Sequence, residues 1–164
     1  MSGRAFVFGD NIDTDVLAPG HLMKLAPEEL ARHCLAAVDP AFARDVRAGD
    51  FVVAGRNFGL GSSREQAAVS LKLLGVKAVL APSFARIFFR NAINLGLPAL
   101  VFDAAGKVAP GDLLDLDLAT GRLDNLARGE THQLTPLPQG LLDVVEAGGL
   151  MEMLKRRFAA SRPA

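Results

Sequence analysis

The feature that most constrains the fold is a regular alternation of short apolar runs and helical segments between residues 51 and 102. A short, continuous apolar run is typical of a strand that is buried on both faces. The runs lie at 51–54, 76–81 and 99–102. The segments between them, 63–74 and 83–95, have helical apolar spacing, and each is followed by a glycine. This β-α-β-α-β order predicts an α/β fold with parallel strands and right-handed crossovers.

The sequence on either side of this section predicts further elements. A strand is expected at 4–8, and a helix is expected to begin at Pro27 and to carry an apolar face as far as Val38. A short helix is expected to end near Val46. The tail first alternates between apolar and acidic residues and then becomes helical. Its expected elements are a strand at 114–118, a hairpin turn at 120–122 with a return from 123, a strand at 130–134, helices at 141–147 and 150–158, and a frayed end at 159–164.

Length and composition bound the class of protein. The 164 residues predict a single domain over 1–164, with a motif-bearing core at about 4–102 and C-terminal strands and helices at about 111–158. Lys plus Arg equals Asp plus Glu, 18 against 18, so neither nucleic acid nor a membrane surface is an expected partner. A single cysteine excludes a disulfide framework and favours a reducing compartment. With no signal peptide or apolar run of membrane-spanning length, a cytoplasmic location is expected.

The densest chemical signal is the loop 55–65, GRNFGLGSSRE, between a predicted strand and a predicted helix. In open α/β sheets, ligands bind at this position, outside the carboxyl ends of the strands. The glycines allow the backbone to approach a ligand closely, and Ser62, Ser63 and Arg64 add two hydroxyls and a guanidinium that suit a carboxylate. The same pattern is typical of a plain helix start that is capped by Ser62 or Ser63. These residues alone leave an anion site and a capped helix open.

One polar cluster precedes this loop in the chain and another follows it. Asp10 to Asp15 holds three carboxylates that suit a hard cation or an arginine. Ser83 is expected to cap the next helix, whose Arg86 and Arg90 share one face because they are four residues apart. For both arginines an anionic partner within the fold is favoured over a ligand. None of the three histidines has metal-ligand spacing, and no metal-ligating residue is predicted.

The three clusters occur together, and in the same order, in a known family. DNIDTD at 10–15, GRNFGLGSSRE at 55–65 and SFARIFFRN at 83–91 closely resemble the small subunit of 3-isopropylmalate dehydratase. More broadly, they resemble the swivelling C-terminal domain of aconitases. The resemblance implies a single swivelling β/β/α domain. It also implies a hydro-lyase subunit that isomerises 2-isopropylmalate to 3-isopropylmalate by dehydration and rehydration, in leucine biosynthesis.

The resemblance further implies a large-subunit partner, in a heterodimer or heterotetramer, without which the chain is inactive. In the family that partner carries a [4Fe–4S] cluster, and the small subunit closes over it to complete a site for a small dicarboxylic hydroxy acid. No cofactor is expected in this chain, because a cluster needs several thiolates and Cys34 is the sole cysteine.

Site roles carry over from the family by matching position. Ser62 corresponds to the serine base, whose alkoxide takes the proton from the carbon next to the departing hydroxyl. Ser63 and Arg64 correspond to residues that bind the substrate carboxylate. Asp15 corresponds to an acidic residue of the active site that orients its neighbours.

One stretch departs from the family pattern. The usual small subunit of this short type has arginine, tyrosine and leucine after the Pro-Gly of its first loop, whereas Pro19-Gly20 is followed here by HLMK. In the family this loop sets substrate choice, so Leu22, Met23 and Lys24 are expected to face the variable group of the substrate. A small subunit acting on homoaconitate or a methylated malate stays open as an alternative. A non-catalytic anion-binding or regulatory module is the alternative of another class.

Overall fold

Seven strands form one mixed sheet in the computed structural model, which describes residues 2–161. Their order across the sheet is β4-β3-β2-β1-β5-β6-β7. The parallel strands are β1 (Ser2–Val7), β2 (Phe51–Val53), β3 (Ala78–Ala81) and β4 (Ala99–Val101). The antiparallel strands are β5 (Leu113–Asp117), β6 (Arg122–Asn125) and β7 (Glu130–Gln133). The parallel pairing predicted for the section 51–102 is therefore confirmed, as are the hairpin and the last strand.

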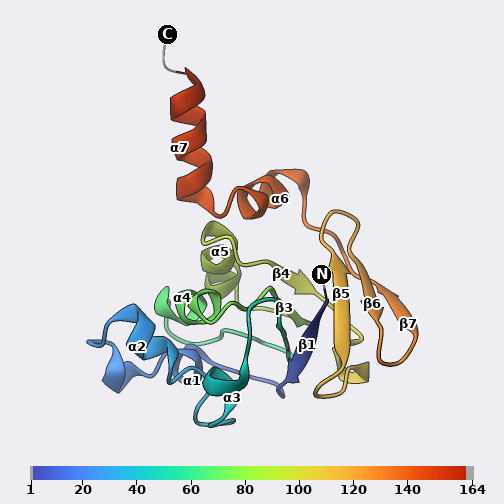
Figure 1. Ribbon diagram of the computed structural model, residues 1–164. Coiled ribbons are helices and arrows are strands. Elements are labelled where there is room, and N and C mark those ends of the chain that lie inside the picture. The colour runs from blue at the N-terminus through green and yellow to red at the C-terminus, as the bar shows by residue number, and fades with distance from the viewer. Residues whose placement is uncertain (1, 162–164) are drawn as a thin grey trace.

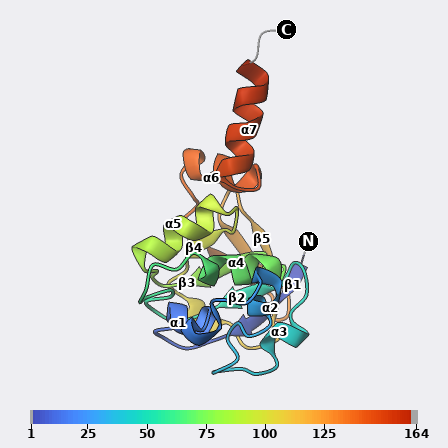
Figure 2. The ribbon, with the colours of Figure 1, turned by 90° about the vertical axis from the view of Figure 1, so that its left-hand side faces the viewer.

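The helices that connect the parallel strands lie on one side of the sheet (Figures 1 and 2). Between β1 and β2 the chain forms α1 (Thr14–Leu17), the short 3-10 helix η1 (Gly20–Leu22), α2 (Pro27–Ala31) and α3 (Phe42–Asp45). The next two crossovers are α4 (Gln66–Leu73) and α5 (Arg86–Asn94). After β4 come the 3-10 helix η2 (Ala105–Lys107), the antiparallel strands, α6 (Gln139–Glu146) and α7 (Leu150–Ser161).

Each face of the parallel strands has its own hydrophobic core. Val52 and Val79 point toward the helices and pack in one core, whereas Phe51, Val53 and Leu80 point the other way and pack in the second. The second core is completed by apolar residues of β5 and β6, such as Leu114 and Leu123, and of α6. Burial on both faces explains why the parallel strands are apolar without alternation. The expected β/β/α architecture is confirmed.

The helix predicted from Pro27 to Val38 is wrong in its second half. It ends at Ala31, and Leu35 has a left-handed φ of 62°. The Leu35 N–H donates to the Val16 carbonyl oxygen at 3.0 Å, and its side chain is fully buried. Docking of this turn under α1 outweighs the helical pattern, and Val38 is left 52% exposed.

Both crossover helices begin two to three residues later than their serines suggest. The N-cap positions of α4 and α5 are Glu65 and Ala85, and neither has a side-chain cap. Ser83 is therefore not a helix cap, and that prediction is wrong.

The C-terminal helix α7 extends away from the rest of the molecule in both views (Figures 1 and 2). None of its described residues is buried, and Phe158 is 68% exposed. The helix continues to Ser161, so the fraying expected from residue 159 is not found at 159–161, and 162–164 lie outside the described residues. No helix within 2–161 combines the length and apolarity that crossing a membrane requires.

Candidate active site

The loops at the carboxyl ends of β1, β2 and β3 form a short second ladder beyond the sheet. Asp13 pairs with Leu60, and Phe58 pairs with Phe84, in isolated parallel bridges. Backbone hydrogen bonds of 2.7 to 3.1 Å accompany the bridges. The three polar clusters of the sequence are thus lateral neighbours, in the order of the strands that precede them.

Two glycines allow this close approach. A Cβ at Gly55 would overlap the carboxylate of Asp10, which accepts a hydrogen bond from the Arg56 N–H at 2.7 Å. Gly59 has a φ of 84°, and a Cβ there would overlap the side chain of Phe88. The second glycine therefore meets two demands, a left-handed backbone and contact with α5.

Asp15 and Arg64 meet across this ladder, although they are 49 residues apart in sequence. Asp15 Oδ1 accepts hydrogen bonds from the Gly20 N–H at 2.8 Å and from Arg64 Nη1 at 3.0 Å. The Gly20 N–H and the Arg64 guanidinium lower the pKa of Asp15. Arg64 Nη1 also donates to the Ala18 carbonyl oxygen at 2.8 Å. Arg64 is thereby held by one nitrogen, while Nε and Nη2 make no hydrogen bond to the described residues.

Ser62 and Ser63 are exposed and make no hydrogen bond within the described part of the chain. Neither caps α4, so the structure does not support the capped-helix alternative. Their loop runs against the start of α1, since a Cβ at Gly61 would lie 3.2 Å from Thr14 Oγ1. The serine hydroxyls and the free Arg64 nitrogens lie on one exposed loop.

The stretch that departs from the family pattern begins at this same cluster. A Cβ at Gly20 would lie 3.1 Å from Asp15 Oδ1 and 3.5 Å from Arg64 Nη1. Leu22 and Met23 are half-buried and pack against the core on the helix side of the sheet. Lys24 is exposed and has no hydrogen bond or ion pair with the described residues. The structure therefore joins Gly20 to Asp15 and Arg64, and leaves Lys24 in solvent.

The partner expected for Arg86 and Arg90 within the fold is absent among the described residues. Both arginines are exposed, without a hydrogen bond or ion pair there. The residue that supports the loop from behind is Phe88, whose ring lies 5.1 Å from the ring of Phe58 in an edge-on arrangement. The helix turns its aromatic face inward and its cationic face to solvent.

The described residues do not suit a metal or a cluster. No group of three or more His, Cys, Asp or Glu is arranged to hold a metal ion in this part of the chain. Cys34 is fully buried, and burial raises the pKa of its thiol. The one thiol is therefore neither accessible nor readily ionised.

Sequence reasoning missed two asparagines beside the predicted residues. Asn11 and Asn57 both have a φ of 60°, and Asn57 Nδ2 donates to Asn11 Oδ1 at 2.9 Å. Residue type could have indicated them. Asn is enriched in left-handed backbone positions, and each of these asparagines lies in a loop that follows a strand.

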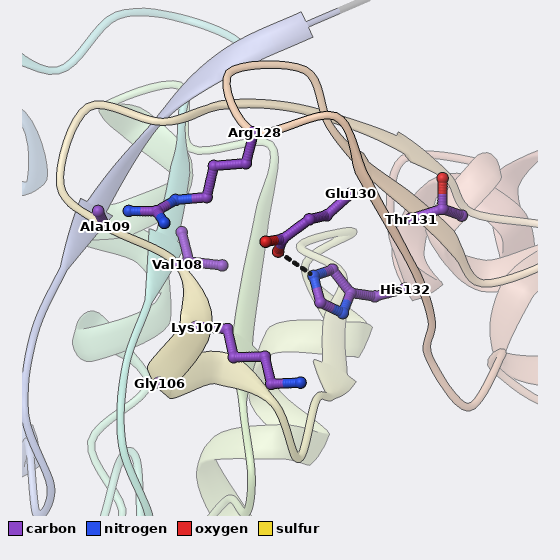
Figure 3. A pocket seen from close by; sticks show the side chains of 8 residues that line it. All are labelled: Gly106, Lys107, Val108, Ala109, Arg128, Glu130, Thr131 and His132. Carbon is purple, nitrogen blue, oxygen red and sulfur yellow. Dashed lines mark ion pairs between the residues drawn. The ribbon is translucent and has the colours of Figure 1, made fainter.

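A hollow of about 670 Å³ lies elsewhere, between η2 and β7 (Figure 3). It contains none of the predicted site residues. Glu130 Oε2 lies 3.4 Å from His132 Nε2 in it, and Arg128 is engaged by Asp112. The exposed loop after β2, which holds Ser62, Ser63 and Arg64, lies outside this hollow.

Comparison with known proteins bears on this site. Residues 27–105 match the family model described as the aconitase C-terminal domain. The chain is 51% identical over 154 residues to 3-isopropylmalate dehydratase small subunit 1 of Archaeoglobus fulgidus, covering 93% of this chain and 96% of that protein. It is 46% identical over 164 residues to the isopropylmalate/citramalate isomerase small subunit of Methanocaldococcus jannaschii, covering 99% and 98%.

A solved structure agrees with the sequence matches. The crystal structure of 3-isopropylmalate dehydratase from Methanocaldococcus jannaschii superposes with a TM-score of 0.92 at 42% sequence identity. The match covers 97% of this chain and 95% of that chain. The likeness therefore includes the antiparallel strands and the C-terminal helices as well as the three motifs.

Proposed function

The chain belongs to the family of 3-isopropylmalate dehydratase small subunits, and on this premise we propose that it supplies the base and the carboxylate-binding groups for the interconversion of 2-isopropylmalate and 3-isopropylmalate. The observation that carries the proposal is the state of Arg64. One of its nitrogens is fixed by Asp15 and Ala18, and the other two make no hydrogen bond to the described residues, like the hydroxyls of Ser62 and Ser63 on the same loop.

Ser62 is the proton-transfer group in this proposal. It takes the proton from the carbon next to the one that bears the hydroxyl, and it returns a proton there in the reverse direction. A serine is a weak base unless its anion is stabilised. The loop N–H groups and the Arg64 guanidinium supply that stabilisation once a partner excludes water.

Ser63 and Arg64 bind a substrate carboxylate. The planar guanidinium presents Nε and Nη2 as a fork, the geometry that suits a carboxylate. Asp15 fixes the other side of the guanidinium and, through the Gly20 N–H, the start of the loop that meets the alkyl group. The lowered pKa of Asp15 favours its ionised form, which is the form that pairs with Arg64.

The small-subunit names of the relatives imply a large subunit as partner. In this proposal the large subunit would carry a [4Fe–4S] cluster, which would supply a Lewis acid for the substrate hydroxyl. The residues of this chain do not fit that cluster, since its only thiol is buried. The two chains meet at the exposed loops after β1 and β2, in the cytoplasm.

Leu22 and Met23 face the alkyl group, and their half-buried positions leave part of each side chain for a ligand. Each buried methylene contributes about 0.8 kcal/mol, so isopropylmalate and a methylated malate differ by only about 10- to 20-fold. The isopropylmalate/citramalate name of one relative favours the methylated malate as a second substrate. A third carboxylate, as in homoaconitate, would meet an apolar surface and be disfavoured unless Lys24 pairs with it.

The test is co-expression with a family large subunit, followed by anaerobic assay of the complex on isopropylmalate, citramalate and homoaconitate. Turnover is expected for the first two substrates, and none is expected for this chain alone. Lys24→Ala is compared with Lys72→Ala, which removes an exposed lysine of α4. A preference for homoaconitate that is lost only in Lys24→Ala would assign Lys24 to the substrate. A stable complex without turnover on any substrate would favour the non-catalytic module.

A further inference from the structure

Asn11 and Asn57 adopt an uncommon backbone conformation where the two longest site loops leave the sheet. Both have a φ of 60°, and Leu35 is the only other non-glycine with positive φ among the described residues. Asn tolerates the left-handed region because its short polar side chain can hydrogen-bond locally. Both asparagines are exposed, so they contribute little to either hydrophobic core.

The two asparagines and Ser83 form one chain of hydrogen bonds across three loops. Asn57 Nδ2 donates to Asn11 Oδ1 at 2.9 Å, and the Asn57 N–H donates to Ser83 Oγ at 2.9 Å. The Asn11 N–H donates to the Arg56 carbonyl oxygen at 2.8 Å. We call Asn11, Asn57 and Ser83 the asparagine latch.

We propose that the asparagine latch is a positioning device for the reaction, an inference that rests on the proposed function. The latch fixes the strand end of the loop ladder, and the Asp15–Arg64 pair fixes the far end. Ser62 lies between these two ties and has no hydrogen bond of its own within the described residues. The exposed Asp15–Arg64 ion pair is a weak tie by itself. The position of the Ser62 hydroxyl relative to Arg64 then depends on the latch together with the main-chain hydrogen bonds of the ladder.

The latch acts on the proton-transfer group more than on carboxylate binding. Arg64 keeps its bonds to Asp15 and Ala18 when the latch is broken, because neither bond involves a latch residue. A displacement of about 1 Å at a reacting group costs up to about 100-fold in rate. Loss of the latch is thus expected to lower kcat and to leave KM nearly unchanged.

Two substitutions separate the side-chain link from the backbone conformation. Asn57→Gly keeps the left-handed backbone and removes the amide, so kcat is expected to fall about 10- to 100-fold while Tm changes little. Asn57→Asp keeps a hydrogen bond between the two side chains. If the Asn11 side-chain amide rotates by 180°, its NH₂ group can donate to the new carboxylate. This variant is expected to keep near-normal kcat. Asn94→Ala, at an exposed asparagine of α5, is the matched control.

Amide hydrogen exchange of the same variants provides a readout that does not need activity. The N–H groups of Gly59 and Thr14, which bond across the ladder, are expected to exchange faster in Asn57→Gly and at the normal rate in Asn57→Asp. Normal kcat or normal exchange in Asn57→Gly would overturn the latch. If the wild-type complex converts no alkylmalate, the proposed function fails, and the exchange comparison alone then decides whether the latch positions the loops.

Discussion

The parallel and antiparallel parts of the sheet are tied together by different chemistry. In the parallel part, main-chain hydrogen bonds join the loops after β1, β2 and β3, and glycines permit their approach. In the antiparallel part, the tie is made by side chains at the start of β5. Asp112 Oδ2 accepts hydrogen bonds from Asn125 Nδ2, Arg128 Nε and the Ala109 N–H, each at 2.9 Å.

This difference agrees with the proposal that the parallel part carries the chemistry. A ladder built from main-chain groups leaves the hydroxyls of Ser62 and Ser63 and two nitrogens of Arg64 without a hydrogen bond among residues 2–161, as the proposed binding of a ligand requires. The side chains of the polar cluster around Asp112 bond to one another within the fold, so Arg128 is already engaged beside the hollow between η2 and β7 (Figure 3).

The largest effect is expected from Ser62→Ala in the complex with the large subunit. Removal of a proton-transfer group is expected to lower kcat about 10²- to 10⁴-fold. The hydroxyl is exposed and has no hydrogen bond to the part of the chain that the structure describes, so the free energy of unfolding should change by no more than about 0.5 kcal/mol. Steady-state kinetics and urea unfolding measure the two quantities. Near-normal turnover would show that the free side chains of the parallel part are not catalytic.

Gly59→Ala tests whether the ladder depends on close backbone approach. The new Cβ would overlap Phe88 and sit on a left-handed backbone, at an expected cost of about 2–4 kcal/mol in unfolding free energy. Gly106→Ala, in the connection to the antiparallel part, has open space and is the matched control, with an expected change within about 0.5 kcal/mol. Equal Tm values for the two variants would contradict the ladder's dependence on glycine.

Arg64→Lys tests the proposed two-donor contact between the Arg64 guanidinium and the substrate carboxylate. A lysine keeps the charge but cannot present two parallel N–H donors. Loss of one charge-assisted hydrogen bond of about 1.5–3 kcal/mol corresponds to a rise in KM of about 10- to 100-fold. Arg90→Lys, at an exposed arginine without a partner among the described residues, should leave KM unchanged. If Arg64→Lys keeps its KM, the carboxylate contact lies elsewhere, and Arg86 is the next candidate.

Asp112→Asn tests the tie of the antiparallel part. Hydrogen bonds from Asn125, the Ala109 N–H and Arg128 lower the pKa of Asp112 in the folded state. A lowered carboxyl pKa contributes stability above the unfolded value, and that contribution is lost as pH falls through the folded pKa. The variant is therefore expected to lose about 1–2 kcal/mol at pH 7 and to show a shallower stability loss in acid. Unfolding curves between pH 7 and pH 3 measure this, with exposed Asp103→Asn as control.

The fold was largely predictable because its parallel strands are buried on both faces and must be apolar throughout. Where a tertiary contact competed with a local pattern, prediction failed. Leu35 fits a helix face in sequence, but its N–H bonds to Val16 and its side chain fills the core under α1. Serine is a common helix N-cap residue, but Ser83 instead accepts a hydrogen bond from the Asn57 N–H of a neighbouring loop.

The candidate site was predictable as motifs but not as contacts. Residue types and order indicated Ser62, Ser63, Arg64 and Asp15, and their assigned roles stay predictions. Asp15 holds Arg64 because two loops that are distant in sequence lie side by side. No residue spacing within one sequence predicts such a contact. The asparagine latch was missed for the same reason.

The buried thiol of Cys34 has a practical consequence for spectroscopy. Reagents that modify thiols act on accessible thiolates, and this side chain is fully enclosed with a raised pKa. A cysteine placed at an exposed position, such as Phe158→Cys on α7, would be the only reactive thiol of the chain. The wild-type sequence thus serves as its own unlabelled background for a fluorophore or spin label that reports when the large subunit docks.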